Sequence, residues 1–293
     1  MSRWDIKASP YLFIAPFFVI FAVFGLFPLL YTAWVSLHKW DLGGDGGFVG
    51  LGNYATLFDD PDFWNSVVNT LGMLVLSTVP QLLFALVLAA LLNQKLRGRL
   101  LLRMGVLLPI VTSVAAVGIV FSQIFDRDAG MANGLLHLFG VAPIDWRADK
   151  WSSWVAISSM VDWRWTGYNS LIYLAAMQSI PRELYEAATV DGASKVRQFW
   201  SITVPMIRPA IVFTVIVSTI AGMQLFTEPL IFGQGTYAIS GGSLRQFQTV
   251  SMYMFEKAFR DYDLGYGSAV AWMIFLLITI LAVVNFLITR RSK

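Results

Sequence analysis

Six long apolar stretches dominate the sequence, and each is long enough to cross a lipid bilayer as a helix. A spanning helix needs about 20 mostly apolar residues, and lipid leaves every backbone amide and carbonyl to be bonded within the protein. The six stretches are residues 11–37, 69–92, 100–125, 153–180, 209–232 and 264–289. The sequence therefore predicts an all-α, polytopic membrane protein with six transmembrane helices in one domain over residues 1–293.

The composition agrees with a membrane protein and excludes several other classes. Hydrophobic residues make up 57% of the chain and charged residues 13%, with a mean hydropathy of +0.64, whereas soluble domains are about half apolar and a quarter charged. A net charge of +3 is too small to indicate nucleic-acid binding. With no cysteine and only His38 and His137, the chain is poor in metal ligands and nucleophiles. We expect no catalytic residue, metal or cofactor in it.

The basic residues predict the orientation of the chain in the membrane. Twelve lysines and arginines lie at the N-terminus, at the C-terminus and in the second–third and fourth–fifth loops, against seven in the loops of the other side. Arg103 and Arg164 fall inside spans. Because the side richer in positive charge faces the cytoplasm, we expect both termini in the cytoplasm and the glycine clusters, residues 43–47 and 233–242, in solvated outer loops.

The loop between the fourth and fifth spans, residues 181–208, differs in kind from the spans. A short helix is expected over residues 183–190. Asp191-Gly192 is typical of a turn, because glycine adopts a positive φ readily. Ser194 can then cap a second short helix over residues 195–201. Taken alone, such a segment is also compatible with a solvated connecting loop.

The sequence of this loop carries a long and specific motif. It reads Glu186-Ala187-Ala188-Thr189-Val190-Asp191-Gly192-Ala193, followed by Ile202-Thr203-Val204-Pro205. This motif resembles the coupling loop of permeases of ABC importers, and it lies on the side that the basic residues predict to be cytoplasmic. The resemblance implies the type I ABC importer permease fold and a short helix that docks on an ATP-hydrolysing subunit. The residues it implies for this coupling are Glu186, Ala187, Ala188, Asp191, Gly192 and Ala193.

Further motifs extend the resemblance over most of the chain. Residues 48–54, 63–70 and 175–181 look like sugar permeases of the maltose-permease type, although the two additional N-terminal helices of the maltose member are not expected for this chain. Residues 162–170 and 223–229 are similar to actinobacterial permeases for cellobiose and cello-oligosaccharides. The resemblance implies import of a disaccharide or short oligosaccharide, including cellobiose or another β-glucoside, across the bacterial cytoplasmic membrane by alternating access.

The same resemblance implies partners, because the chain carries no Gly-x-x-x-x-Gly-Lys-Ser/Thr motif with which to bind ATP. ATP and magnesium are then expected on two separate ATPase subunits. A second, similar permease would complete a heterodimer, and an extracytoplasmic binding protein would deliver the sugar. The chain itself is not expected to be an enzyme or to bind nucleic acid.

Polar residues inside the fourth and fifth spans are candidates for the substrate path, because such residues are costly in lipid. Indole rings stack on the C–H faces of pyranoses, and amides and hydroxyls bond to their hydroxyl groups. Interhelical ion pairing, close packing of small residues and core filling by tryptophan are alternative explanations for the same residues. The candidates are Asp162, Arg164, Trp165, Gly167, Asn169, Ser218, Gln224 and Glu228.

Three other functions remain open from the sequence. An ion- or proton-coupled secondary transporter could use Asp162 and Glu228 as relays. An importer of glycerol phosphate could pair Arg164 with the phosphate. An enzyme acting on lipid-linked sugars would need a catalytic carboxylate beside a metal site or a basic pocket, and the sequence indicates neither.

Overall fold

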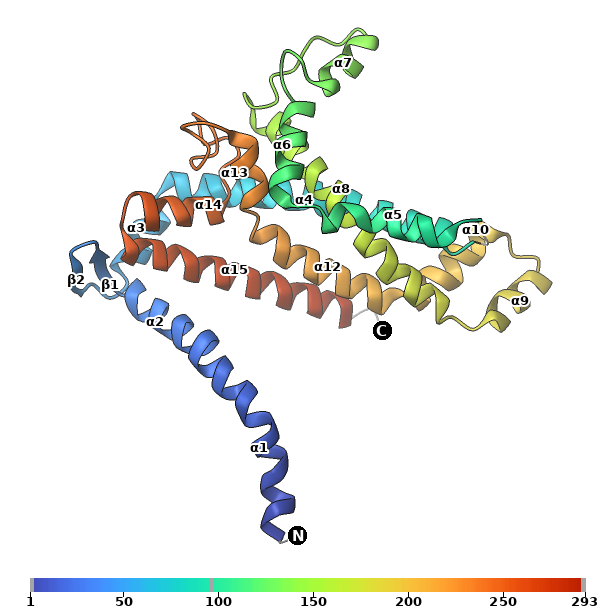
Figure 1. The fold of residues 1–293 in the computed structure, drawn as a ribbon, viewed down its shortest axis with the longest axis horizontal. Helices are drawn as coiled ribbons and strands as arrows, with labels where there is room; N and C mark the ends of the chain where they lie inside the picture. The colour runs from blue at the N-terminus through green and yellow to red at the C-terminus, as the bar shows by residue number, and fades with distance from the viewer. Residues whose placement is uncertain (1–2, 95–96, 291–293) are drawn as a thin grey trace. The chain divides into compact units, whose positions relative to one another are not determined.

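The computed structural model describes residues 3–94 and 97–290 (Figure 1). Lys95, Arg291 and Lys293, which contribute to the predicted charge bias, lie outside these residues. The described chain divides into two compact units. The first unit contains residues up to Asp60 together with Met254–Phe275, and the second contains Pro61–Tyr253 together with the residues from Leu276 onward.

The N-terminal part of the first unit is a long helical segment followed by a small hairpin and a short helix. Its elements are α1 (Arg3–Phe21), a π-helical turn (Ala22–Leu26), α2 (Phe27–Ser36), β1 (His38–Asp41), β2 (Gly44–Phe48), α3 (Gly52–Asp59), a second π-helical turn (Glu256–Arg260) and the first part of α15 (Leu264–Arg290). Asn53 Nδ2 donates to the carbonyl oxygens of Ser36 at 2.8 Å and His38 at 3.0 Å, which fixes α3 against the start of the hairpin.

The hairpin corrects two predictions. Residues 43–47 were expected in a solvated loop, but Gly44–Phe48 pairs with His38–Asp41 as an antiparallel two-stranded sheet, so that the fold is not strictly all-α. The strands can pair because Gly44 and Gly47 adopt φ angles of +99° and +105°, which other residues rarely adopt. The composition does not predict the second strand, since glycine-rich segments are poor strand formers.

The second unit is helical in its described residues. Its elements are α4 (Pro61–Leu92), α5 (Arg99–Val111), α6 (Val114–Ile124), α7 (Met131–Leu138), α8 (Lys150–Gln178), α9 (Arg182–Val190), α10 (Lys195–Gln198), a π-helical turn (Phe199–Thr203), α11 (Val204–Met206), α12 (Arg208–Met223), α13 (Thr227–Gly233) and most of α14 (Val250–Phe255). The last part of α15 also belongs to this unit.

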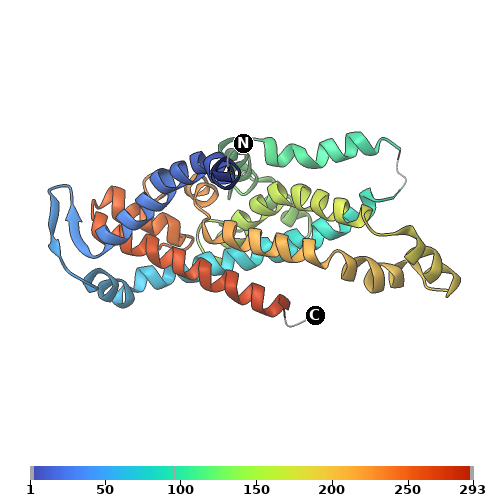
Figure 2. The ribbon, with the colours of Figure 1, turned by 90° about the horizontal axis from the view of Figure 1, so that it is seen from below.

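Helices α4 and α8 run side by side and form the centre of the second unit, with α12 alongside α4 (Figure 2). The close approach depends on Gly72, where a side chain would overlap the ring of Trp154. Met73 of α4 and Ile157 of α8 are fully buried in one apolar cluster, and Tyr173 of α8 lies with Ile207, just before α12, in a second cluster. Buried side chains of this size stabilise a fold by about 1.5–3 kcal/mol each in water, and in lipid by close packing instead.

Up to five of the six predicted spans meet the requirement of length and hydropathy. In the described residues, three helices are long and apolar enough to cross a membrane: Tyr11–Ser36, Pro61–Leu92 and Leu264–Leu287. Two bent pairs, residues 99–124 and 195–223, can each count as one span. The fourth predicted span is helical as α8, but its polar residues keep it out of this set. Six spans and cytoplasmic termini therefore stay predictions.

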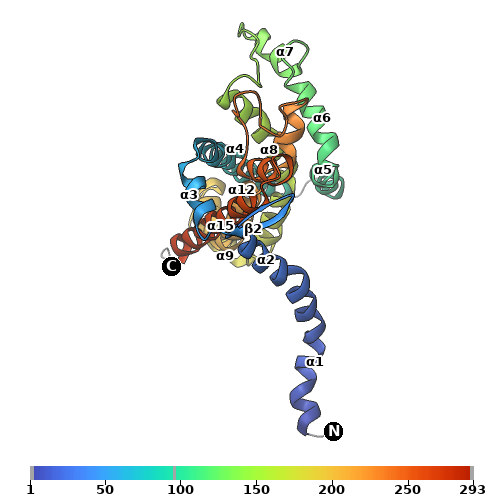
Figure 3. The ribbon, with the colours of Figure 1, turned by 90° about the vertical axis from the view of Figure 1, so that its left-hand side faces the viewer.

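Two predicted spans are not continuous helices. The third bends by 90° where Thr112 and Ser113 adopt extended backbone angles between α5 and α6 (Figure 3). Pro109, one turn earlier, lacks an amide hydrogen and so weakens the end of α5. The fifth ends at Met223 and resumes at Thr227 as α13, so that the helix opens just before Glu228-Pro229.

Candidate functional site

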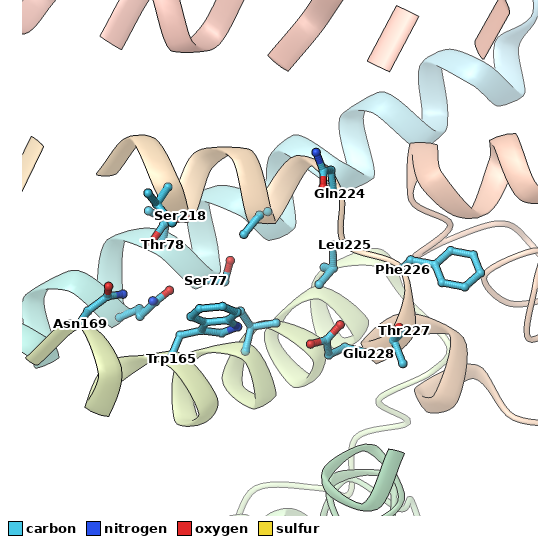
Figure 4. Close-up of a pocket in the computed structure, with 15 residues that line it drawn as sticks. Ser77, Thr78, Trp165, Asn169, Ser218, Gln224, Leu225, Phe226, Thr227 and Glu228 are labelled. Carbon is cyan, nitrogen blue, oxygen red and sulfur yellow. The ribbon is translucent and has the colours of Figure 1, made fainter. Parts of the chain in front are cut away.

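A pocket of about 140 Å³ lies within the second unit, between α4, α8, α12 and α13 (Figure 4). Its polar lining residues come from all four helices and from the break between α12 and α13, while apolar residues and Trp165 complete its walls. The lining residues are Ser77, Thr78, Gln81, Val161, Trp165, Asn169, Val217, Ser218, Ala221, Gly222, Gln224, Leu225, Phe226, Thr227 and Glu228. A ring face together with hydroxyl, amide and carboxylate groups is a surface suited to a polyhydroxylated ligand.

Five of the eight predicted substrate-path residues meet in this pocket: Trp165, Asn169, Ser218, Gln224 and Glu228. They are up to 63 positions apart in the sequence, and the packing of α8 against α12 and α13 brings them together. Trp165 and Asn169 point into the pocket from successive turns of α8 (Figure 4). The side-chain nitrogen of Asn169 is buried and has no hydrogen-bond partner among the described residues.

Three lining residues of α4 escaped the sequence reasoning. Ser77, Thr78 and Gln81 are buried, and they occupy consecutive turns beside Pro80 in the second predicted span. Buried polar side chains beside a proline, in a helix that is otherwise apolar, are a signal of a functional cavity in a membrane helix. The sequence carries this signal in the second predicted span, as polar residues next to a proline, whereas the predicted candidates come from the fourth and fifth spans.

The break between α12 and α13 forms one wall of the pocket. Gln224 and Leu225 still donate their amide hydrogens to Ala221 and Gly222 at 3.1 and 3.3 Å, and the chain then leaves the helix at Phe226, with φ −139° and ψ −56°. Thr249 Oγ1 donates to the Leu225 carbonyl at 2.7 Å. Because a distant loop satisfies this carbonyl, the irregular backbone is supported inside the protein.

Arg164 and Glu228 form a buried ion pair beside the pocket. Arg164 Nη1 lies 2.9 Å from Glu228 Oε1, and the two side chains are 8% and 10% exposed. Arg164 therefore pairs with a different helix rather than with Asp162, which resolves one alternative left open by the sequence. Glu228 lines the pocket whereas Arg164 does not, so that the arginine lies behind the carboxylate.

Asp162 and Gly167 lie elsewhere on α8. Both line a separate groove of about 440 Å³ formed by α4, α5 and α8, together with Trp163 and Pro109. A Cβ on Gly167 would overlap the carbonyl oxygen of Val106, so that this glycine allows α5 to approach α8 closely. The structure thus places six of the eight predicted residues at or directly behind the pocket, and these two outside it.

The predicted coupling loop forms a helical elbow. Helix α9 ends at Val190, and Gly192 follows in the left-handed region with φ +73°, as the turn prediction requires. Ser194 Oγ accepts a hydrogen bond from the Arg197 amide at 3.3 Å, which confirms the predicted cap. The second helix is shorter than predicted: α10 ends at Gln198 and continues as a π-helical turn.

Hydrogen bonds from α10 to α9 and to the turn fix the shape of the elbow, and the outer surface of the elbow makes few contacts. Gln198 Nε2 donates to the Ala193 carbonyl at 2.9 Å and to Thr189 Oγ1 at 3.1 Å. The predicted coupling residues Glu186, Ala187, Asp191 and Gly192 are exposed, and Ala188 and Ala193 are half-buried. The elbow therefore offers a smooth surface of small side chains flanked by two carboxylates.

Comparisons with known proteins agree with this architecture. The family model described as "Binding-protein-dependent transport system inner membrane component" matches residues 71–293. The lactose transport system permease protein LacF of Rhizobium radiobacter is 38% identical over 303 residues, covering 100% of this chain and 99% of that protein. The arabinooligosaccharides transport system permease protein AraP of Halalkalibacterium halodurans is 33% identical over 289 residues, covering 98% and 89%.

Among solved structures, the bacterial alginate ABC transporter in complex with alginate pentasaccharide-bound periplasmic protein has a chain of the same fold. The TM-score is 0.83 at 22% sequence identity, with 99% of this chain and 98% of that chain covered. The family match over residues 71–293 and the full-length relatives lead to one conclusion. This chain belongs to the family of inner membrane components of binding-protein-dependent transport systems.

Proposed function

We propose that this chain is a permease subunit of an ABC importer that moves a disaccharide or short oligosaccharide across the bacterial cytoplasmic membrane. The observation that carries the proposal is the pocket between α4, α8, α12 and α13, where an indole, amides, hydroxyls and a carboxylate converge. Two extensively matched relatives are named for lactose and arabinooligosaccharide transport, which supports a sugar as the cargo. Cellobiose or another β-glucoside is the particular sugar we propose.

The size of the pocket supports a heterodimer. Ligand pockets are usually about 300–1,000 Å³, and the pocket in this chain measures about 140 Å³. We infer that this chain supplies one wall of the path and that a second, similar permease supplies the other. An extracytoplasmic binding protein would deliver the sugar, as a periplasmic protein accompanies the alginate transporter of the same fold.

The coupling loop is proposed as the docking surface for one of two ATPase subunits. In the predicted orientation the elbow faces the cytoplasm, and its small side chains let a partner surface approach closely. Closure of the ATPases on ATP would draw two such loops together and open the path outward, and hydrolysis would return it inward. The proposed coupling residues are Glu186, Ala187, Ala188, Asp191, Gly192 and Ala193.

The coupling proposal is tested by uptake and by ATPase activity in the complete complex. Gly192→Asp and Glu186→Lys should each abolish uptake while the chain still inserts into the membrane. Asp128→Lys, a charge reversal on an exposed turn between α6 and α7, is the matched control and should transport normally. Normal uptake by both loop variants would contradict docking through this elbow.

The pocket proposal is tested by two neighbouring tryptophans on different faces of α8. Trp165 lines the pocket, whereas Trp163 lines the groove beside α5. In Trp165→Ala, the sugar concentration that gives half-maximal stimulation of ATPase activity should rise about tenfold. The reason is that the loss of one stacking contact costs about 1.4 kcal/mol of binding free energy. Trp163→Ala should change it little. Equal effects of the two substitutions would place the sugar elsewhere.

The geometry gives little support to a secondary transporter. That alternative used Asp162 and Glu228 as relays, but the two carboxylates line different cavities, and Glu228 is held by Arg164. The two mechanisms also differ in energy source. Uptake by this chain alone, driven by an ion gradient and insensitive to ATP depletion, would favour the secondary transporter.

A further inference from the structure

The charges at the pocket are balanced within the protein. Of the described residues that line the pocket, Glu228 alone has an ionisable side chain, and the others are apolar, hydroxyl or amide residues. The guanidinium of Arg164 lies against that carboxylate at 2.9 Å and does not itself line the pocket. A ligand therefore meets one negative group whose charge is compensated from behind.

The ion pair leaves the carboxylate able to accept further hydrogen bonds. Its described contact with Arg164 uses Oε1, and Oε2 accepts no hydrogen bond from a described residue. A carboxylate oxygen is a strong acceptor for a hydroxyl. On the same wall, the buried Asn169 nitrogen is a donor without a described partner. Sugar hydroxyls both donate and accept, so that they can satisfy both groups.

An anionic ligand would meet the opposite situation. Its negative charge would be repelled by Glu228, while the nearest cation is already engaged and buried behind that group. Such effects are stronger in a buried site than in water, because the surroundings screen charge poorly. A phosphate-bearing substrate would need Arg164 released toward the ligand, and release would leave the carboxylate buried without its counter-charge.

We infer that the Arg164–Glu228 pair makes this pocket selective for uncharged sugars, with Glu228 as the hydroxyl acceptor and Arg164 as its charge-balancing residue. The inference rests on the proposed sugar path and adds a substrate class to it. It also separates this chain from an importer of glycerol phosphate. Arg164 acts through Glu228 and is a positioning residue rather than a contact for the sugar.

The decisive variant is Glu228→Gln. The glutamine keeps the shape of the side chain and an acceptor for Arg164, but it removes the negative charge and leaves the arginine charge uncompensated beside the pocket. The preference of the pocket should then shift from uncharged toward anionic ligands by about tenfold or more. The double variant Arg164→Gln/Glu228→Gln carries neither charge and should lose this shift.

The test uses the importer complex of the two permeases and two ATPase subunits. The binding protein is left out, so that the sugar selectivity of the binding protein does not contribute. Equilibrium dialysis measures the dissociation constants of cellobiose and of the corresponding disaccharide that carries one uronate carboxylate. The wild-type complex should bind cellobiose at least about tenfold more tightly, and Glu228→Gln should reduce or reverse that ratio. Asp145→Asn, which removes a carboxylate from an exposed ion pair with Arg127, is the control and should leave the ratio unchanged.

The possible failures are distinguishable. A wild-type complex that binds cellobiose but binds the uronate equally well or better would overturn the inference and leave the proposed sugar transport intact. So would a folded Glu228→Gln complex with the wild-type ratio. A wild-type complex that binds neither sugar and shows no sugar-stimulated ATPase activity would overturn the proposed function, and the inference with it.

Discussion

The pocket and the coupling elbow belong to the same unit, but contacts of different range shape them. The pocket is held by pairs far apart in the sequence: Arg164 with Glu228, 64 positions apart, and Leu225 with Thr249, 24 positions apart. The elbow is held by Gln198 and Ala193, five positions apart, and by the cap at Ser194. Several polar side chains at the pocket are buried, among them Gln81, Asn169 and Glu228, whereas the carboxylates Glu186 and Asp191 of the elbow are exposed.

The difference reflects what surrounds each region. A cavity among membrane-spanning helices has little water to satisfy its polar groups, so each needs a partner within the protein or in the ligand. A loop that docks a partner, as proposed for the elbow, must keep its outer surface free, and so local backbone preferences have to fix its shape. Substitutions at the pocket should therefore affect the stability of the whole unit, and those at the elbow chiefly the coupling.

The largest effect is expected from breaking the buried ion pair on one side. Arg164→Met leaves the Glu228 carboxylate buried without a counter-charge and should destabilise the protein by about 3 kcal/mol. The double variant Arg164→Met/Glu228→Met removes both charges and should recover most of that loss. Unfolding of the detergent-solubilised protein, followed by tryptophan fluorescence, measures both values. A double variant as unstable as the single one would show that the cost arises from packing rather than charge.

The second effect concerns the groove face of α8. Gly167→Ala would place a methyl group on the Val106 carbonyl oxygen and force α5 away from α8, at a cost of about 1–3 kcal/mol. Gly105→Ala is the matched control on the facing helix, because a Cβ there meets no described atom within 4 Å. The same unfolding measurement compares them. If both alanine variants are equally stable, the close approach of the two helices is not required.

The same contrast explains what the sequence could predict. The turn at Asp191-Gly192 and the cap at Ser194 follow from the preferences of single residues, and both were predicted at the correct positions. Most helices were also predicted, because long apolar stretches leave few alternatives in a membrane. Long-range packing places Arg164 against Glu228 rather than Asp162, and no local pattern encodes that choice.

Breaks in the spans were harder to predict for a related reason. Apolar residues lie on both sides of Thr112-Ser113 and of Gln224, so hydropathy averaged over a span gives no indication that the helices stop there. The second break is supported by Thr249 from a later loop, and such support cannot be recognised before the fold is known. Ser77, Thr78 and Gln81 are uncharged residues in an otherwise apolar span, so they stand out less in the sequence than the charged residues of the fourth span.

A smaller, local effect is expected at the elbow from Gly192→Ala. Its φ of +73° costs an alanine about 1–2 kcal/mol, although a Cβ there meets no described atom within 4 Å. Global stability should change little, because the turn lies at the exposed end of the loop, whereas sugar-stimulated ATPase activity should fall. Gly192→Asn should retain more activity, since asparagine tolerates this region of φ better. Equal losses of activity in both variants would indicate that the partner requires a residue without a side chain at this position, rather than the backbone angle itself.

The smallest effect is expected from Ser194→Ala, which removes the hydroxyl that accepts from the Arg197 amide at 3.3 Å. Loss of an N-cap costs about 1 kcal/mol, and here Gln198 still holds the elbow through the Ala193 carbonyl. Hydrogen exchange should therefore accelerate at the first amides of α10 while the pocket helices keep their protection. Ser194→Asp supplies another capping oxygen and should restore slow exchange. Faster exchange at α8 in the alanine variant would show that the elbow and the pocket are not independent.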